Sequence, residues 1–211
     1  MTEKLLEIIA EKYPLTELEV RDDIKASGMK FDIRSYNAEG LGHVSVMSAR
    51  GFFGLMRMDT LIVNPKNVDL PLYSYDRIYA MGNDVLIVEL YDTLADPASF
   101  CMDDVKQSYS DVSDRDPGEH WYDGIKLSVS ISKKGKKKDT PRLDELTLEH
   151  FLTYLGAAVS TDNAALKKEK ADVYVEGLLS KGGPSTDAFK KAIGEDKTAE
   201  LFRTVLFGTN R

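Results

Sequence analysis

The spacing of apolar residues changes along the chain, and this change is the strongest constraint on its fold. Near the N-terminus, Leu5, Ile8 and Ile9 recur at helical spacing. Between Met29 and Ile131, apolar and polar residues alternate in short runs, which is typical of half-buried strands. From Thr147 onward the period returns to about 3.6 residues, as in amphipathic helices. Successive strands followed by successive helices predict an α+β fold, because a parallel doubly wound sheet would alternate the two.

Short turns separate most of the predicted strands. Gly40 to Gly42, Gly51 to Gly54 and Met81 to Asp84 have the composition of hairpin turns. Turns this short join antiparallel neighbours. The sequence therefore predicts a mainly antiparallel sheet, with strands at residues 30–36, 43–49, 55–63, 77–80, 85–90 and 125–131.

Helices are predicted before, within and after this region. A first helix spans Thr2 to Tyr13, and a possible capping box at Thr16 and Glu19 predicts a second, ending near residue 26. Another is expected from Asp96 to Tyr109, with Cys101 on its buried face. The C-terminal helices are expected at residues 148–155, 166–178, 188–193 and 201–206. With no internal repeat, residues 1–211 are expected to form a single domain.

Charge and composition exclude several classes of function. The formal net charge of -7 lacks the positive potential that nucleic-acid binding requires. No apolar run approaches the ~20 residues of a membrane-spanning helix, and the N-terminus lacks a signal-peptide pattern, so we expect a cytoplasmic protein without a membrane partner. A single cysteine excludes a disulfide framework or a cysteine-ligated cluster, and the three histidines are far apart in sequence. We therefore expect no metal site and no permanently bound cofactor.

The stretch from Asp69 to Asp76 is the most informative one for chemistry. Motifs of serine hydrolases, phosphate-binding loops, zinc proteases and dinucleotide-binding folds are all absent. Pro71 stiffens a turn, so a neighbouring carboxyl group can be held in one orientation. If Asp76 points between sheet and helices, burial raises the pKa of its carboxyl and makes it a candidate proton donor. The alternative is an exposed aspartate at the start of a strand.

This stretch and the C-terminus resemble the ferredoxin-dependent bilin reductases. In that family an aspartate follows the proline of an Asp-Leu-Pro turn by five residues, as Asp76 follows Pro71 here. The resemblance covers residues 43–92 and 165–208. It rests on Asn64-Pro65, the run from Val68 to Asp76, Gly82-Asn83-Asp84 before residues 85–90, and the segments Tyr174 to Leu179 and Leu201 to Gly208.

The resemblance implies a three-layer α/β/α sandwich with a central, mainly antiparallel sheet. A linear tetrapyrrole would lie between the sheet and the C-terminal helices, and ferredoxin or flavodoxin would supply electrons one at a time. Asp76 matches the family aspartate that faces the bilin and takes part in protonation. The family's histidine would fall near Asp59 or Thr60 and its glutamate within residues 44–48, where this sequence has neither.

Further candidate residues follow from the same interpretation. Asp59 shares a strand face with Arg57, so the two could act as a second catalytic acid and a substrate-binding cation; a surface ion pair is the alternative. An acidic ferredoxin could dock on a basic block, which is otherwise a solvated hairpin tip. Substrate-binding candidates are also Asp69, Pro71, Tyr73 and Tyr75, and the basic block consists of Lys133, Lys134, Lys136, Lys137 and Lys138.

These observations predict a bilin reductase-like protein. It would bind a linear tetrapyrrole or a similar conjugated ligand and reduce it with electrons from an external donor, with Asp76 donating protons. Two alternatives remain open: a non-catalytic ligand-binding protein of the same fold, and a protein-interaction domain without a small ligand.

Overall fold

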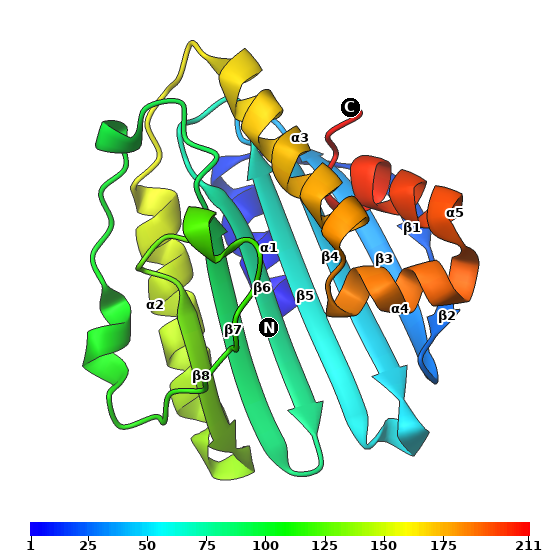
Figure 1. The fold of residues 1–211 in the computed structure, drawn as a ribbon. Coiled ribbons are helices and arrows are strands. Elements are labelled where there is room, and N and C mark those ends of the chain that lie inside the picture. Colours follow the sequence, from blue (N-terminus) through cyan, green and yellow to red (C-terminus); the bar gives the residue numbers. More distant parts are fainter.

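A computed structural model describes all 211 residues, and its centre is an eight-stranded antiparallel sheet (Figure 1). The strand order is β1-β3-β4-β5-β6-β7-β8, and the short β2 also pairs with β3. Hairpin turns make consecutive strands neighbours from β3 to β7, as predicted. The strands are β1 (Leu15–Arg21), β2 (Lys25–Ala26), β3 (Met29–Ala38), β4 (Gly42–Gly51), β5 (Met56–Pro65), β6 (Leu72–Ala80), β7 (Asn83–Tyr91) and β8 (Ile131–Lys136).

Helices cover both faces of the sheet. On one face lie α1 (Thr2–Lys12) and α2 (Thr140–Gly156), and on the other lie α3 (Ala164–Lys181), α4 (Pro184–Ile193) and α5 (Glu195–Glu200) (Figure 1). A π-helical segment, Leu201–Leu206, continues α5. This arrangement confirms the predicted α+β sandwich. None of the helices combines the length and the apolar character needed to cross a membrane.

Alternation along the strands creates two hydrophobic cores. In β6, Tyr73 and Tyr75 pack into the core under α1 and α2, whereas Ser74 and Asp76 face the layer of α3 and α4. Because both faces of the sheet are covered, the central strands bury side chains on both sides. The second core contains Tyr91, Tyr174 and Phe189 among others.

Two predicted helices are wrong. Residues 16–26 contain strand β1, because pairing with the open edge of β3 satisfies more backbone groups than a short capped helix would. The segment from Asp96 to Tyr109 is a loop with single 3-10 turns at Pro97–Ser99 and Val105–Tyr109. Cys101 is exposed in that loop and does not lie on a buried helix face.

The last strand starts where the predicted one ends. Around residues 125–130 the chain follows β7 only briefly, with the Leu127 amide donating to the Leu90 carbonyl at 2.8 Å, and then turns. The lysine block therefore begins inside β8 instead of at a hairpin tip. β6 is also longer than predicted, so Asp76 lies in the middle of a nine-residue strand.

Candidate ligand-binding site

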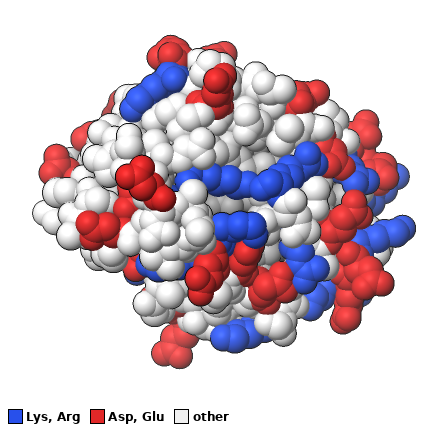
Figure 2. All heavy atoms as spheres, turned by 90° about the horizontal axis from the view of Figure 1, so that it is seen from above, with Lys and Arg blue, Asp and Glu red and all other residues white.

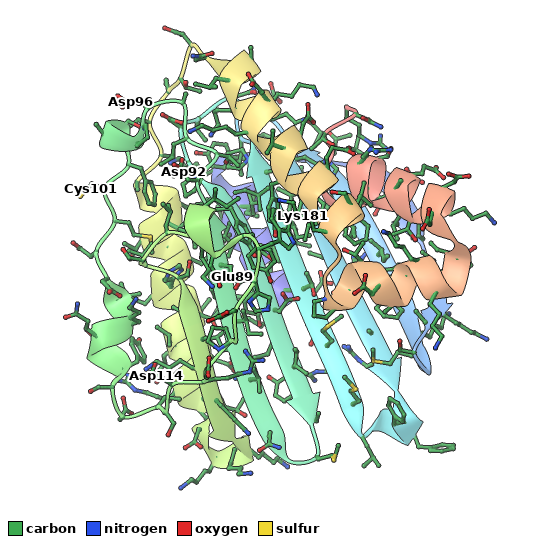
Figure 3. The ribbon with its side chains drawn as sticks, in the orientation of Figure 1. Glu89, Asp92, Asp96, Cys101, Asp114 and Lys181 are labelled. Carbon is green, nitrogen blue, oxygen red and sulfur yellow. The ribbon has the colours of Figure 1, made fainter.

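Asp76 lies on the sheet face that α3 and α4 cover. Its direct cross-strand neighbour is Thr60 of β5, whose hydroxyl donates a hydrogen bond to Asp76 Oδ1. On β7, Glu89 pairs with Ser74, which makes Glu89 the diagonal neighbour of Asp76 on the same face. Figure 3 shows Glu89 on β7, the second strand from the β8 edge of the sheet, beside the loop that precedes β8. The sheet thus places two carboxyl groups side by side beneath the helical layer.

Two adjoining cavities open onto these carboxyl groups. The inner cavity has a volume of about 110 Å³ and the outer one about 430 Å³. The outer cavity alone falls in the size range of small-molecule sites, roughly 300–1,000 Å³. The six residues that line both cavities are Asp76, Glu89, Tyr122, Pro184, Ser185 and Phe189.

Aromatic side chains form one wall of the inner cavity. Tyr91 of β7 stacks on Tyr174 of α3, with ring centroids 4.2 Å apart and planes inclined by 30°. Tyr122, from the long connection between β7 and β8, meets Tyr91 edge-on at 5.5 Å. Aromatic faces of this kind suit a flat, conjugated ligand.

Burial changes the acidity of Asp76. Loss of solvation raises the pKa of its carboxyl from 3.8 to about 6, because the charged form loses its hydration. The hydrogen bond from Thr60 acts in the opposite direction, and the nearby charge of Glu89 raises the pKa further. Asp76 can therefore be protonated close to neutral pH.

Glu89 is held from two sides. The Tyr91 hydroxyl donates to Glu89 Oε2 at 2.5 Å, and Lys126 Nζ lies 3.6 Å from Glu89 Oε1. Lys126 also pairs with Asp123 at 2.7 Å, which connects Glu89 to the surface through charged groups. These two contacts fix the orientation of the Glu89 carboxylate, and its side chain is only 15% exposed.

A cation and a histidine complete the lining of the outer cavity. Arg115 is part-buried, takes part in no ion pair, and has its nearest side-chain partner, Ser132 Oγ, at 3.5 Å. His120 stacks on Tyr122 with ring centroids 4.9 Å apart, and its buried Nδ1 has no hydrogen-bond partner. No three His, Cys, Asp or Glu side chains in the protein converge in a way that could hold a metal ion.

Several residues predicted for the site lie on the opposite face of the sheet. Asp59 pairs with Arg50 at 2.9 Å and with Arg57 at 3.0 Å, so it belongs to an ion-pair cluster near α1. Tyr73 and Tyr75 are fully buried beneath α1 and α2. Asp59, Arg57, Tyr73 and Tyr75 therefore do not line the cavity beside Asp76, because alternate residues of one strand point to opposite faces.

The Asp-Leu-Pro turn anchors the fold. Asp69 accepts hydrogen bonds from the amides of Ala95 and Asp96 at 2.7 and 2.9 Å. Burial acts to raise the pKa of Asp69, but these bonds outweigh it and leave the pKa below its usual value. The carbonyl of Pro71 accepts from the Tyr154 hydroxyl at 2.9 Å, and Lys167 of α3 donates to the Leu70 carbonyl at 2.7 Å. The turn thus fastens α2 and α3 to the sheet, away from the cavity lining.

The lysine block is split between interior and surface. Lys133 is 3% exposed and donates to the carbonyls of Tyr109 and Val112 at 3.2 and 3.0 Å. It is therefore unavailable for docking, while Lys134, Lys136, Lys137 and Lys138 are exposed.

Five residues that line the cavities were not predicted as site residues from the sequence: Glu89, Arg115, His120, Tyr122 and Tyr174. Glu89 carried a recognisable signal, because it is the only charged residue between Val85 and Leu90. Burying a lone carboxylate in an apolar strand requires a compensating role. The other four come from distant segments and carried no local signal.

Asp76 is expected to reduce stability at neutral pH. Its pKa is higher in the folded state, so folding takes up a proton between about pH 4 and pH 6, and the native state loses stability as the pH rises through that window. We expect Asp76→Asn to increase the free energy of unfolding by about 1–2 kcal/mol at pH 7 and to have no effect below pH 4. Denaturant unfolding at both pH values measures this difference. A variant that is less stable at pH 7, or a difference independent of pH, would contradict it.

Comparison with solved structures supports the architecture. The chain is similar to phytochromobilin synthase from tomato in complex with biliverdin, with a TM-score of 0.70 and 14% identity, over 100% of this chain and 84% of that one. A scan against protein-family models finds no match. A search of curated proteins finds no significant relative. The likeness shows a shared, bilin reductase-like fold.

Proposed function

We propose that this protein binds a linear tetrapyrrole in the cavities above Asp76 and reduces it with electrons from an external one-electron donor. The single observation that carries the proposal is the part-buried carboxyl group of Asp76, which faces an aromatic-lined cavity and has a pKa of about 6. The bilin reductase-like fold supports the choice of ligand class, because the similar tomato structure contains biliverdin.

The cavity lining matches the chemistry of such a pigment. Tyr91, Tyr122 and Tyr174 offer faces and edges for a conjugated ring system. Asp76 and Glu89 can accept hydrogen bonds from pyrrole nitrogens. The unpaired guanidinium of Arg115 is suited to a carboxylate side chain of the pigment, because arginine binds carboxylates through two parallel hydrogen bonds.

The reaction requires one proton for each electron. A donor of the ferredoxin or flavodoxin type passes one electron to the pigment and is itself oxidised. The resulting radical anion is strongly basic, and the protonated carboxyl of Asp76 transfers its proton to it, which traps the electron. Solvent then reprotonates Asp76 through the charged groups around Glu89, and a second electron and proton complete the reduction. In this proposal no flavin or metal is bound permanently.

A second candidate function is ligand binding without reduction. The positions that match the family's histidine and glutamate hold neither residue, so the surroundings of the pigment differ from those in the bilin reductases. Pigment binding without turnover under a low-potential donor would favour this candidate.

Titration with biliverdin tests pigment binding. We expect a change in the visible absorption spectrum that saturates, and about tenfold weaker binding in Arg115→Gln, because a charge-assisted hydrogen bond is lost. Arg142→Gln is the matched control, since Arg142 pairs with Asp111 on the surface and lines neither cavity. No spectral change in the wild-type protein, or equal affinity in the two variants, would contradict this placement of the pigment.

A further inference from the structure

Two hairpin turns at one end of the sheet expose large apolar side chains. The β4–β5 turn carries Phe52, Phe53 and Leu55, which are 54%, 108% and 73% exposed, and the neighbouring β6–β7 turn carries Met81, which is 90% exposed. Both turns project at the lower edge of the sheet in Figure 1. We call this edge the hairpin end. It comprises the two turns (residues 52–55 and 81–82), the two rows of cross-strand residue pairs nearest to these turns, which we call the last two rungs of the sheet, and residues 137–139. Adjacent exposed apolar groups of this size mark an interaction surface.

The backbone at these turns is unfavourable for the residues it carries. Phe52, Phe53 and Met81 have φ angles of 51°, 55° and 48°, in the left-handed region that glycine or asparagine adopts at lower cost. Phe53 and Met81 gain no compensating burial inside the protein. Neither local conformation nor the core therefore explains an aromatic and a methionine side chain at these positions.

Positive charge is concentrated behind the apolar tips. The last two rungs of the sheet and the turn after β8 carry seven cations: Lys25, Lys30, Arg50, Arg57, Lys136, Lys137 and Lys138. The acids of the same rungs and turn are engaged internally, Asp84 in a buried pair with Arg77 and Asp139 on the Lys136 amide. Asp59 lies two residues farther from the turn than Arg57 on β5. It pairs with both Arg50 and Arg57 and so offsets part of their charge.

The hairpin end is basic on a chain whose net charge is -7. At the opposite end of the molecule, many Asp and Glu side chains surround a band of Lys and Arg (Figure 2).

A hollow of about 660 Å³ lies between the tips and the start of α2. Leu55, Arg57, Tyr79 and Lys137 are among its lining residues. The Arg57 guanidinium stacks over the Tyr79 ring at 4.0 Å, which orients the cation at the surface. An anionic group bound there would meet Arg57 and Lys137 together, beside an apolar rim.

We propose that the hairpin end docks on the surface of an anionic phospholipid bilayer. Phe53, Leu55 and Met81 insert among the acyl chains, the cations contact lipid phosphates, and the hollow receives one headgroup. A deformable bilayer fits this shape better than an acidic protein does. The apolar tips project beyond the cations, so they can be buried only by a partner whose surface lets them insert. The expectation of no membrane partner rested on the lack of a spanning helix, which peripheral docking does not require.

This inference goes beyond the proposed function and stands without it. Membrane docking and pigment binding are nevertheless compatible in geometry, because Ser27, Met29 and Met56 line the outer cavity close to the hairpin end. Docking would therefore bring the cavity near the lipid surface.

Flotation with lipid vesicles tests the proposal. The full chain is mixed with phosphatidylcholine vesicles, with or without phosphatidylglycerol. We expect binding only to the anionic vesicles, about fivefold weaker in Lys137→Gln and at least about tenfold weaker in Phe53→Ser. Val173→Ser is the matched control, because Val173 is a 66% exposed apolar residue on α3, away from the hairpin end, and its replacement should leave binding unchanged. Higher salt should weaken the binding of the wild-type protein.

Three outcomes would overturn the proposal. The first is no association with anionic vesicles, and the second is equal association of the Phe53→Ser and Val173→Ser variants. The third is that the vesicles do not bind while a purified acidic ferredoxin binds the wild-type protein and loses affinity for Phe53→Ser and Lys137→Gln. That result would assign the hairpin end to a protein partner instead.

Discussion

Replacing Asp76 with asparagine is expected to lower the rate of pigment reduction by about 10²–10⁴, the usual contribution of a positioned general acid. Asparagine keeps the volume of the side chain and can still accept the hydrogen bond from Thr60, so the cavity and pigment binding should be preserved. Single-turnover absorption spectroscopy with biliverdin and a reduced one-electron donor measures the effect. The variant should bind the pigment and stop after the first electron, because the radical anion receives no proton.

The matched comparison is Asp59→Asn. Asp59 and Asp76 were both predicted as catalytic acids, but they lie on opposite faces of the sheet. We expect Asp59→Asn to retain nearly the full rate of pigment reduction. Undiminished reduction in Asp76→Asn, or an equal loss in both variants, would refute the assignment of the proton donor.

The pH dependence follows from the same carboxyl group. Asp76 must be protonated to act as the proton donor, so the rate of pigment reduction should fall as the pH rises through about 6. The negative charge of Glu89 helps to raise the pKa of Asp76, so Glu89→Gln should move this fall to lower pH. A general structural defect would lower the rate without moving the profile.

Replacing Arg77 with methionine is expected to destabilise the fold by about 3–5 kcal/mol. Arg77 and Asp84 form an ion pair in which both side chains are 1% exposed, with Arg77 Nη2 donating to Asp84 Oδ2 at 2.8 Å. Thr140 of α2 donates to the same carboxylate at 2.5 Å, so the pair ties β6, β7 and α2 together. Without Arg77, the buried Asp84 carboxylate loses its ion-pair partner.

Urea unfolding monitored by circular dichroism measures this loss. Arg142→Met is the control, because Arg142 pairs with Asp111 on the surface, where solvent screens the attraction and the pair adds little stability. Removing both buried partners, as in Arg77→Met with Asp84→Leu, should recover much of the loss, since the fully buried Asp84 carboxylate is removed together with its partner, while Asp144, the other carboxylate near Arg77, is 38% exposed to solvent. If the Arg77 variant were no less stable than the Arg142 variant, the buried pair would not hold the layers together.

Most of the secondary structure could be predicted from local periodicity. The alternation in β3, β4 and β5 and the helical spacing of α1 and α3 were read correctly, because each pattern lies within one segment. Residues 16–26 and 96–109 were misjudged for a common reason. Their conformation depends on distant partners: the open edge of β3 for the first, and the carboxylate of Asp69 for the second.

The candidate site was only partly predictable. Asp76 was identified from its distance to a turn proline, which is a local feature. Tyr73 and Tyr75 neighbour it in sequence but point away from it, because side chains of a strand alternate between faces. Glu89, Arg115 and Tyr174 reach the two adjoining cavities from a neighbouring strand, a long connection and a C-terminal helix, and no sequence spacing relates them.

The amino-acid sequence by itself determined the order and type of most elements and the antiparallel pairing of the hairpins. It also determined the presence of one aspartate beside a rigid turn. Those properties arise from interactions between residues close together in the chain. Only the tertiary structure decided which face of the sheet Asp76 occupies among its neighbours, how far its pKa rises, and which remote side chains share its cavity. These depend on the water that packing removes and on contacts between residues far apart in the chain.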